Sequence, residues 1–322
     1  MKYKVIKADN RYEDIQVEKE ILNKIGAALK EYNLYDEDKI IEVAKDVDGI
    51  ITDLAPMTKK VISNLNNCKV ISKVGTGVDN IDVSAATKKR ILVCNVPDYC
   101  VKEVSDHTLA LILSLTRKVI FLNSRVKKGI WSIDEAKPIH SLSDIVLGLV
   151  GFGKIARLVY SKARVFGFKV IIYDPFIDSL DGEYEAELID FNYLIKNSDI
   201  ISIHCPANPK THHLFSHNQF KAMKPSSYLV NTSRGTIVDS KALYEALKSN
   251  LISGAAVDVY DPEPIEPGDP ILELDNFIIT PHLGFYSERS IEEVRKISAL
   301  NIAAVLSDKK PENVINKELL GN

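Results

Sequence analysis

The stretch GLVGFGKIA, residues 148–156, decides the fold of this chain. It carries Gly151 and Gly153 in the spacing G-x-G-x-x-A, with an alanine in the third glycine position. An apolar run leads into it, and a helix-compatible segment, 154–166, begins inside it. The next apolar run ends at Asp174, 21 residues beyond Gly153. A strand, a glycine-rich turn, a helix and a second strand ending in an acid therefore follow one another.

This combination predicts a dinucleotide site rather than a tight turn that binds nothing. The two glycines let the backbone approach a pyrophosphate at the start of the helix, where free N–H groups and the helix dipole favour anions. Asp174 can accept hydrogen bonds from the adenosine ribose, and its charge would repel a 2′-phosphate. Glycine-rich turns are common, so the glycines alone would be weak evidence, but the complete pattern predicts NAD as the cofactor.

Strand-like and helix-like segments alternate on both sides of this unit. From residue 145 onward, six short apolar runs recur, and helix-compatible segments separate most of them. Six strands with helical crossovers predict a six-stranded, doubly wound parallel sheet of the Rossmann type. The expected strands are Ile145–Val150, Lys169–Tyr173, Asp199–Ile203, Tyr228–Val230, Ala255–Val259 and Phe277–Ile279.

The residues that precede this sheet predict a second unit. The runs YKVIKA, DGIIT, KVISKV and ILVCNV are strand-like, and Asp82 is the expected N-cap of a helix. The segment 101–128 is apolar on nearly every helical face, which predicts burial against another domain or subunit. An amphipathic helix over 290–308 is expected to return to this first unit.

The composition is typical of a soluble, globular protein. The 322 residues are 45% hydrophobic and 26% charged, with a net charge of −3. This balance indicates no basic face for nucleic acid, and the longest apolar run is too short to span a membrane. The four cysteines, Cys68, Cys94, Cys100 and Cys205, form no CxxC pair, so we expect reduced thiols in a cytoplasm.

Three side chains that could take part in catalysis follow three of the expected strands. Arg234 lies in NTSRG, Glu263 in YDPEP and His282 in TPH. Singly, they could be a surface ion pair, a solvated turn residue and a cap. Because the carboxyl ends of parallel strands share one edge of a sheet, however, we expect them to converge. Together they supply what hydride transfer to a 2-keto acid needs, namely a cation, a proton donor and a carboxylate that orients the imidazole.

Longer motifs resemble the D-isomer-specific 2-hydroxyacid dehydrogenase family. The matching stretches are GFGKIA, NTSRGTIVD, GAAVDVYDPEP and TPHLGF, together with VGTGVDNID and CNVPDYCVKEVSDHTLALIL. FGFKVIIYDP, THHLF and HLGFYSE look most like its C-terminal-binding-protein branch. The resemblance implies a smaller, flavodoxin-like α/β substrate domain split between residues 1–98 and 291–322. It also implies an NAD-binding domain over 99–290 and a homodimer built largely on the helix after Val101.

The resemblance assigns roles to individual residues as well. The implied catalytic residues are Arg234, Glu263 and His282, and no metal is implied. The implied substrate-binding residues are Lys73, Val74, Gly75 and Arg234, with backbone N–H groups around Val74 and Gly75 holding the carboxylate. The implied cofactor contacts are Thr76, Thr108, Gly151, Gly153, Lys154, Ile155, Asp174, Cys205, Pro206, Thr211, Thr232, Ser233, Arg234, Asp258 and His282.

Local departures bear on the ligand. The histidines of HHLFSH, residues 212–217, could share a helix face as metal ligands, but no carboxylate or cysteine partner lies beside them. Residues 284–287 read GFYS where the family often has GGxT, so we expect aromatic surface near the active site. Asp53 and Lys73 stand where a phosphate would need arginines, which predicts an unphosphorylated substrate.

The expected function is that of an NAD-dependent oxidoreductase acting on the CH–OH group of a small 2-hydroxy acid, or on the corresponding 2-keto acid. Two alternatives stay open. One is a D-3-phosphoglycerate dehydrogenase, and the other is an NAD(H)-sensing, corepressor-like binding protein. The expected partners are the small acid and a second copy of the chain, without nucleic acid or membrane, in the cytoplasm.

Overall fold

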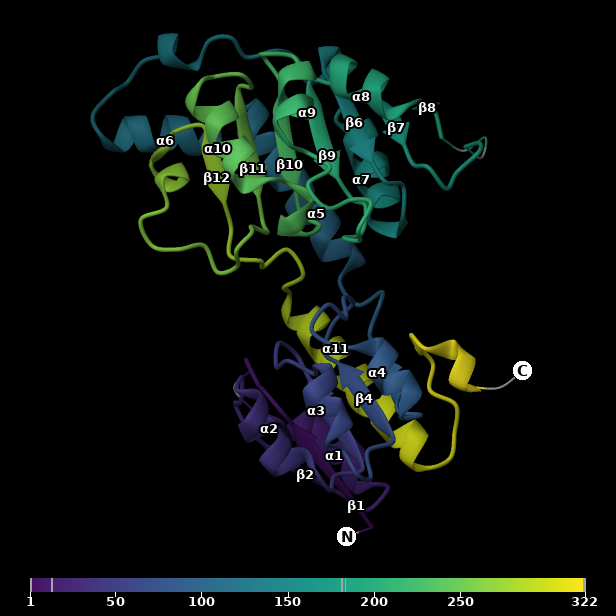
Figure 1. The fold of residues 1–322 in the computed structure, drawn as a ribbon. Helices are drawn as coiled ribbons and strands as arrows, with labels where there is room; N and C mark the ends of the chain where they lie inside the picture. Colours follow the sequence, from purple (N-terminus) through teal and green to yellow (C-terminus); the bar gives the residue numbers. More distant parts are fainter. Residues whose placement is uncertain (1, 13, 181, 183, 321–322) are drawn as a thin grey trace. The chain divides into compact units, whose positions relative to one another are not determined.

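The computed structural model describes residues 2–12, 14–180, 182 and 184–320. The chain divides into two compact units (Figure 1). Unit 1 comprises Met1–Cys100 and Ser287–Asn322, and unit 2 comprises Val101–Tyr286. The outermost residues of the expected split domain, 1 and 321–322, lie outside the described residues.

Unit 1 is built on a parallel sheet with the strand order β2-β1-β3-β4-β5. This order is that of flavodoxin-like folds, as predicted. The sequence AALKE of β2 was not predicted to be a strand, because it lacks the β-branched and aromatic residues that mark one. The strands are β1 (Tyr3–Lys7), β2 (Ala27–Glu31), β3 (Gly49–Thr52), β4 (Val70–Lys73) and β5 (Leu92–Cys94).

The C-terminal helix completes unit 1. Helix α11 packs against α1 and against strands β3 and β4, which confirms the expected return of the tail. Asp82 caps α4 as predicted, since its carboxylate accepts a hydrogen bond from the Ala85 N–H over 2.8 Å. The helices are α1 (Gln16–Asn23), α2 (Glu37–Ala44), α3 (Lys59–Ser63), α4 (Val83–Lys88) and α11 (Glu288–Leu306).

A buried ion cluster fastens α11 to the start of the chain. The Lys7 ammonium lies 2.6 Å from Glu18 Oε1, and Arg295 Nη2 lies 2.9 Å from Glu18 Oε2. Both Lys7 and Glu18 are fully buried. Burial alone would raise the pKa of Glu18, but the hydrogen bond from Arg295 and the charge of Lys7 hold it below its ordinary value. Glu18 is therefore a buried carboxylate that two cations compensate.

Unit 2 is built on a larger parallel sheet in the order β12-β11-β10-β9-β6-β7-β8. The chain winds outward in both directions from β6, which is the doubly wound topology that was predicted. A two-residue edge strand, β8, joins the six predicted ones. The strands are β6 (Val146–Val150), β7 (Lys169–Tyr173), β8 (Glu187–Leu188), β9 (Ile200–Ile203), β10 (Tyr228–Asn231), β11 (Gly254–Val257) and β12 (Phe277–Ile279).

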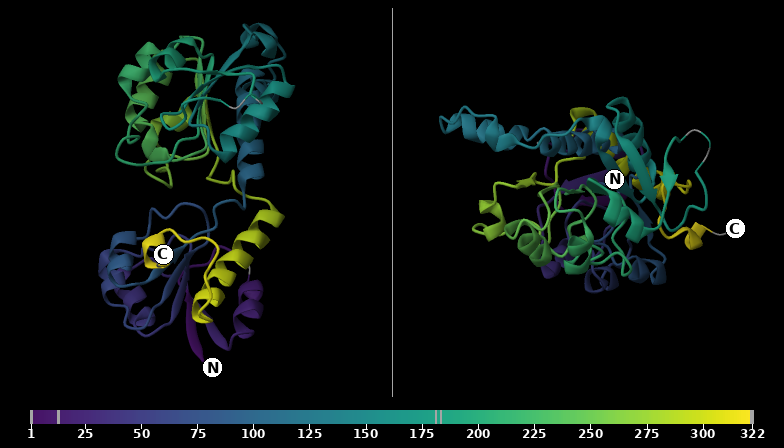
Figure 2. Two further views of the ribbon diagram at one scale, coloured as in Figure 1. Left: turned by 90° about the vertical axis from the view of Figure 1, so that its right-hand side faces the viewer. Right: turned by 90° about the horizontal axis from the view of Figure 1, so that it is seen from above.

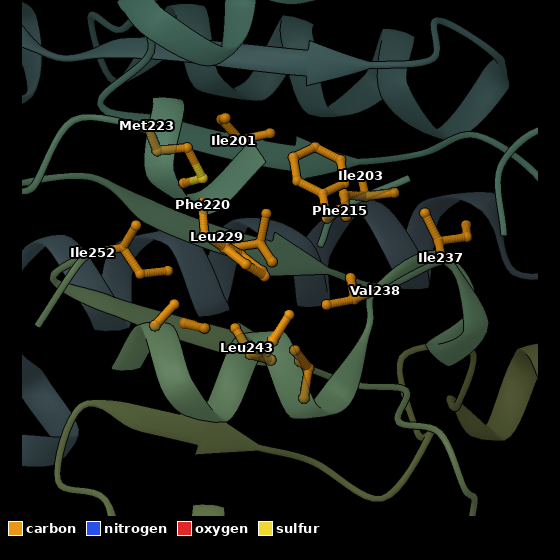
Figure 3. Close-up of a cluster of buried hydrophobic side chains, with 14 of the residues drawn as sticks. Ile201, Ile203, Phe215, Phe220, Met223, Leu229, Ile237, Val238, Leu243 and Ile252 are labelled. Atoms are coloured by element: carbon orange, nitrogen blue, oxygen red, sulfur yellow. The ribbon is translucent and has the colours of Figure 1, made fainter. Parts of the chain in front are cut away.

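Helices cover both faces of this sheet. One face carries a core in which Phe220 of α9 and Leu243 of α10 meet Leu229 of β10 (Figure 3). Helices α5 and α7 cover the other face, where Ile112 and Val159 are buried. The helices are α5 (Val101–Thr116), α6 (Val119–Lys127), α7 (Lys154–Val165), α8 (Phe191–Asn197), α9 (His217–Ala222) and α10 (Ser240–Lys248).

The long apolar helix expected over 101–128 is two helices. The chain breaks at Lys118, whose φ of 53° is left-handed, and α6 starts at the next residue. The apolar side of α5 packs against α7, β10 and β11 of its own unit. The apolar side of α5 is therefore buried within its own unit, and burial against a second subunit stays a prediction.

Helix α6 differs from α5 because none of its residues is buried. Val119 is 55% exposed, and in the following segment Trp131 and Ile133 are 89% and 75% exposed. This part of the chain extends away from the sheet of unit 2 (Figure 2). A cavity of about 350 Å³ opens between α6 and the amino ends of β11 and β12. Of the helices that the structure describes, none is long and apolar enough to cross a membrane.

Candidate active site

The glycine-rich turn joins β6 to α7 in the conformation that its sequence predicts. Gly151 has a φ of 91°, and a Cβ there would lie 2.8 Å from the Cys205 backbone nitrogen, so only glycine fits. Gly153 caps α7, and a Cβ built on it meets no atom of the chain within 4 Å. Lys154 and Ile155 follow as the first residues of α7. An open helix N-terminus therefore lies at the carboxyl end of β6, where an anion can bind.

Asp174 lies beside this turn. It follows β7 directly, and its Oδ2 accepts a hydrogen bond from the Phe152 N–H over 2.8 Å. Its Oδ1 accepts a second one from the Phe176 N–H over 2.9 Å. The carboxylate is thus held in a fixed orientation next to the glycine-rich turn, where the sequence predicts the ribose.

The other predicted cofactor residues lie in the loops after β9 and β10. The Ser233 hydroxyl donates to the Cys205 carbonyl over 2.5 Å, and the Thr211 hydroxyl donates to the Pro206 carbonyl over 2.7 Å. Burial raises the pKa of the Cys205 thiol to about 11, so it stays protonated and unreactive at neutral pH.

Thr108 is fully buried in α5. Its hydroxyl donates to the Val104 carbonyl and lies 2.8 Å from the Thr232 hydroxyl. Thr108 is thus linked to the loop after β10 through Thr232, and its expected contact with the cofactor stays a prediction.

The structure brings His282 and Glu263 together. His282 Nδ1 lies 2.6 Å from Glu263 Oε1, and both side chains are partly exposed. Because a carboxylate only accepts, Nδ1 carries the proton of this hydrogen bond, and Nε2 is left for a ligand. The Phe285 ring stands edge-on at 6.2 Å from the imidazole, which confirms the expected aromatic surface beside His282.

Arg234 follows the neighbouring strand β10 and begins a short turn, Gly235–Ile237. Its Nη1 donates to the Ser233 carbonyl over 2.8 Å, and its own carbonyl accepts from Asn231 Nδ2 over 2.9 Å. A Cβ on Gly235 would collide with the Tyr260 carbonyl in the loop after β11. The turn that carries Arg234 is therefore packed directly on the loop that leads to Glu263.

Asp258 and His107 take part in a network that sequence reasoning found only in part. Asp258 was predicted as a cofactor contact, but it is buried and its carboxylate accepts from Leu283 N–H, Gly284 N–H and the Thr280 hydroxyl. His107 Nε2 lies 2.9 Å from that hydroxyl. His107 lies within the motif CNVPDYCVKEVSDHTLALIL, but sequence reasoning assigned it no role. Its position on the buried side of α5, opposite the strand that ends in TPH, is the signal that could have found it.

The predicted substrate-binding residues of unit 1 need correction. The Val74 N–H donates to the Thr52 carbonyl over 2.8 Å, so the prediction that it binds a carboxylate is wrong in this conformation. Lys73 is buried, and its ammonium bonds both the carbonyl and the carboxylate of Asp53. It is therefore not open to a substrate. Gly75 has a φ of 145°, which favours glycine, and the exposed Thr76 donates to the Val96 carbonyl over 3.1 Å.

Asp53 is itself enclosed by cations. Its Oδ2 accepts from Arg11 Nε over 2.6 Å, and its Oδ1 lies 3.0 Å from the Lys73 ammonium. The sequence-based argument that Asp53 repels a phosphate therefore fails, because its charge is compensated.

The histidines of HHLFSH take other partners. The rings of His212 and His213 stack at 4.0 Å, and His217 lies 3.6 Å from Glu245. Among the described residues, no group of three or more His, Cys, Asp or Glu side chains is arranged to hold a metal ion.

This chain is similar to known proteins over most of its length. D-3-phosphoglycerate dehydrogenase of Methanocaldococcus jannaschii is 38% identical over 97% of this chain, which spans only 59% of that relative's length. Glyoxylate reductase of Korarchaeum cryptofilum is 34% identical over 87% of this chain and 86% of its own. D-lactate dehydrogenase of Aquifex aeolicus, solved with NAD and lactic acid, superposes with a TM-score of 0.86 at 29% identity, covering 97% of this chain and 98% of that one.

The family model described as D-isomer specific 2-hydroxyacid dehydrogenase, NAD binding domain, matches residues 109–284. This range contains the glycine-rich turn, Asp174 and the loops that carry Arg234, Glu263 and His282. The chain therefore belongs to the D-isomer-specific 2-hydroxyacid dehydrogenase family, and residues 109–284 match that family's NAD-binding domain.

Proposed function

We propose that this protein is an NAD-dependent D-2-hydroxyacid dehydrogenase that interconverts a small, unphosphorylated 2-keto acid and its D-2-hydroxy acid. The observation that carries the proposal is the hydrogen bond between His282 and Glu263 at the carboxyl edge of a doubly wound sheet. A histidine oriented by a carboxylate is a proton donor and acceptor, which is what a carbonyl needs when it receives a hydride. Unit 2 is then the cofactor domain, and unit 1 is the substrate domain.

The residues of unit 2 fit NAD. The N–H groups at the start of α7 suit a pyrophosphate, and Asp174 suits the hydroxyls of a ribose. Asp258, with Thr232 and Ser233, stands at the neighbouring strand ends, where the nicotinamide half belongs. When bound, the reduced cofactor supplies the hydride that adds to the carbonyl carbon.

Each of the three proposed catalytic residues has a separate role in the reaction. The Arg234 guanidinium holds the substrate carboxylate and stabilises the negative charge that develops on the carbonyl oxygen. His282 donates a proton from Nε2 to that oxygen, so that the carbonyl gains one hydride and one proton and becomes an alcohol. Glu263 keeps the imidazole in place through Nδ1 and stabilises its positive charge before the transfer.

The charges of unit 1 support an unphosphorylated substrate. A phosphate dianion needs several cations with open donor groups. At the carboxyl edge of the unit 1 sheet, Arg11 and Lys73 are already engaged with Asp53. Within unit 1 we retain Gly75 and Thr76 as proposed ligand contacts. The runner-up is phosphoglycerate dehydrogenase activity, which the 38% identity to an archaeal protein of that name favours.

We also propose that the protein is a cytoplasmic homodimer. The exposed apolar side chains of α6 and the segment after it are the kind of surface that a second copy covers. None of the four cysteines, all of which the structure describes, is part of a disulfide, which suits a reducing compartment. Fractionation of the source cells would test the compartment.

The substrate assignment predicts a rank order of 2-keto acids. Pyruvate, 2-ketobutyrate, glyoxylate, 4-methylthio-2-oxobutyrate or phenylpyruvate should be reduced with a higher kcat/KM than 3-phosphohydroxypyruvate. The physical reason is that the cations of unit 1 that lie near the loop after β3 are compensated by Asp53. Steady-state oxidation of NADH with each compound measures the order. The highest kcat/KM with the phosphorylated compound would establish the runner-up function instead.

Asp174 predicts a preference for NADH over NADPH. A 2′-phosphate would meet a carboxylate of like charge, so we expect kcat/KM to favour NADH by roughly 100-fold or more. Asp174→Asn removes the charge but keeps the shape of the side chain. It should lower the ratio of kcat/KM with NADH to kcat/KM with NADPH, mainly by raising kcat/KM with NADPH. Asp178→Asn changes an exposed acid of the same loop and is the matched control. Equal use of both cofactors by the unmodified protein would contradict this role of Asp174.

Glu263→Gln should change the pH profile of keto-acid reduction. Removing the negative charge beside His282 makes its protonated form less stable, so the alkaline limb should move to lower pH while NADH affinity is kept. His282→Ala should lose roughly 10²–10⁴-fold in kcat, the usual contribution of a general acid. Glu266→Gln, in the same loop, serves as the control. An unmoved alkaline limb in Glu263→Gln would mean that Glu263 has another role.

The dimer proposal predicts that charges in the segment after α6 separate the subunits. The double variant Trp131→Glu and Ile133→Glu should run as a monomer in light scattering, with an unchanged circular dichroism spectrum, because carboxylates cannot be buried unpaired in an apolar interface. Val165→Glu adds a charge at an equally exposed apolar position of α7 and should leave the mass unchanged. A monomeric unmodified protein would remove the basis of this proposal.

A further inference from the structure

The loop that presents His282 is wrapped around one buried carboxylate. Asp258 Oδ1 accepts from the Leu283 N–H over 3.0 Å, and Oδ2 accepts from the Gly284 N–H over 2.8 Å. The His282 N–H itself donates to the Asp258 carbonyl over 2.8 Å. Three consecutive amides of residues 282–284 therefore bond to a single residue of the neighbouring strand end.

These bonds hold a backbone conformation that a histidine does not favour. His282 has a φ of 51°, in the left-handed region, where the Cβ of an L-residue crowds the backbone. Such a conformation persists only where the surroundings impose it. Burial alone would raise the pKa of Asp258, but the hydrogen bonds from His107, Thr280, Gly284 and Leu283 hold it below its ordinary value. The loop is therefore organised around the Asp258 carboxylate, which can only accept hydrogen bonds.

His107 of α5 completes the shell around this anion. The Thr280 hydroxyl has one proton, and its oxygen lies 2.6 Å from Asp258 Oδ1, which must accept that proton. The hydroxyl is therefore an acceptor toward His107 Nε2, which lies 2.9 Å away. It follows that Nε2 of His107 carries a hydrogen. The same nitrogen lies 3.4 Å from Asp258 Oδ1, so one N–H serves both oxygens.

His107 also packs against the loop. A Cβ built on Gly284 would lie 3.3 Å from His107 Cδ2 and 2.9 Å from Asp258 Oδ2. The ring thus lies beside Gly284 and within hydrogen-bond distance of Thr280. Helix α5 is in this way joined by one side chain to the segment that displays the proposed proton donor.

We propose that His107 is a positioning residue for His282, acting through Thr280 and Asp258 on the conformation of residues 280–284. This inference rests on the proposed function of His282 as proton donor. His107 touches neither substrate nor cofactor in this scheme. Its contribution is to keep the imidazole of His282 within reach of both Glu263 and the carbonyl oxygen.

Kinetics of His107→Ala and His107→Gln test the catalytic half of the proposal. Loss of the donor should lower kcat for keto-acid reduction by roughly 10- to 100-fold, as displacements of about 1 Å do, with KM and NADH affinity kept within about threefold. Gln can offer an N–H at a similar reach and should restore most of the rate. In a His282→Ala background, His107→Ala should cost little more, because it acts through His282.

A readout without turnover tests the structural half. Hydrogen exchange of the peptide that contains Leu283 and Gly284, measured by mass spectrometry on the whole protein, should speed up in His107→Ala and return to normal in His107→Gln. His140→Ala, which removes an exposed histidine of the same unit, is the matched control.

The two readouts separate the possible failures. If the unmodified protein reduces keto acids but His107→Ala changes neither kcat nor exchange, the positioning role is wrong and the proposed function stands. If exchange changes while the unmodified protein reduces no keto acid, the proposed function is wrong, and only the coupling of His107 to the loop survives. An additive loss in the His282→Ala background would show that His107 acts elsewhere.

Discussion

Parallel strand direction is the constraint on which the candidate site depends. All strand pairs in the described part of the unit 2 sheet are parallel, so the loops after β10, β11 and β12 leave the sheet at one edge. Arg234, Glu263 and His282 come from these three loops, and their distance in sequence does not matter. The same edge receives the start of α7 after β6, where we propose that the phosphates of the cofactor bind. One geometric property of the sheet thus brings together the proposed cofactor site and the proposed acid–base pair.

The features that the sequence predicts well are those encoded locally. Gly151 and Gly153 lie within a few residues of the strand and helix that they join, and Asp82 caps α4 through the N–H of Ala85, three residues further on. Strands such as β6 and β9, buried on both faces, read as continuous apolar runs. The meeting of Glu263 and His282 could be predicted because it needs only strand order and direction.

The features that could not be predicted from the sequence depend on partners far away in the chain or on a single backbone angle. No role was predicted for His107, whose Thr280 partner lies 173 residues further on. The Val74 N–H was expected to be open, but pairing with Thr52 of the neighbouring strand end consumes it. The break at Lys118 follows from a left-handed residue in a segment with helical periodicity throughout. In each case a hydrogen bond or backbone angle decides, and the pattern of apolar residues does not contain it.

At His282, the residue that the backbone conformation favours differs from the residue that the proposed reaction needs. Glycine adopts a φ of 51° without steric cost, and asparagine does so more readily than histidine. A search for more heat-resistant variants of this chain would therefore favour glycine or asparagine at 282, and either would remove the imidazole. Histidine at this position is less favourable for the backbone than glycine or asparagine. Stabilising the protein without loss of activity has to begin elsewhere, in parts of unit 2 that do not touch the 280–284 loop.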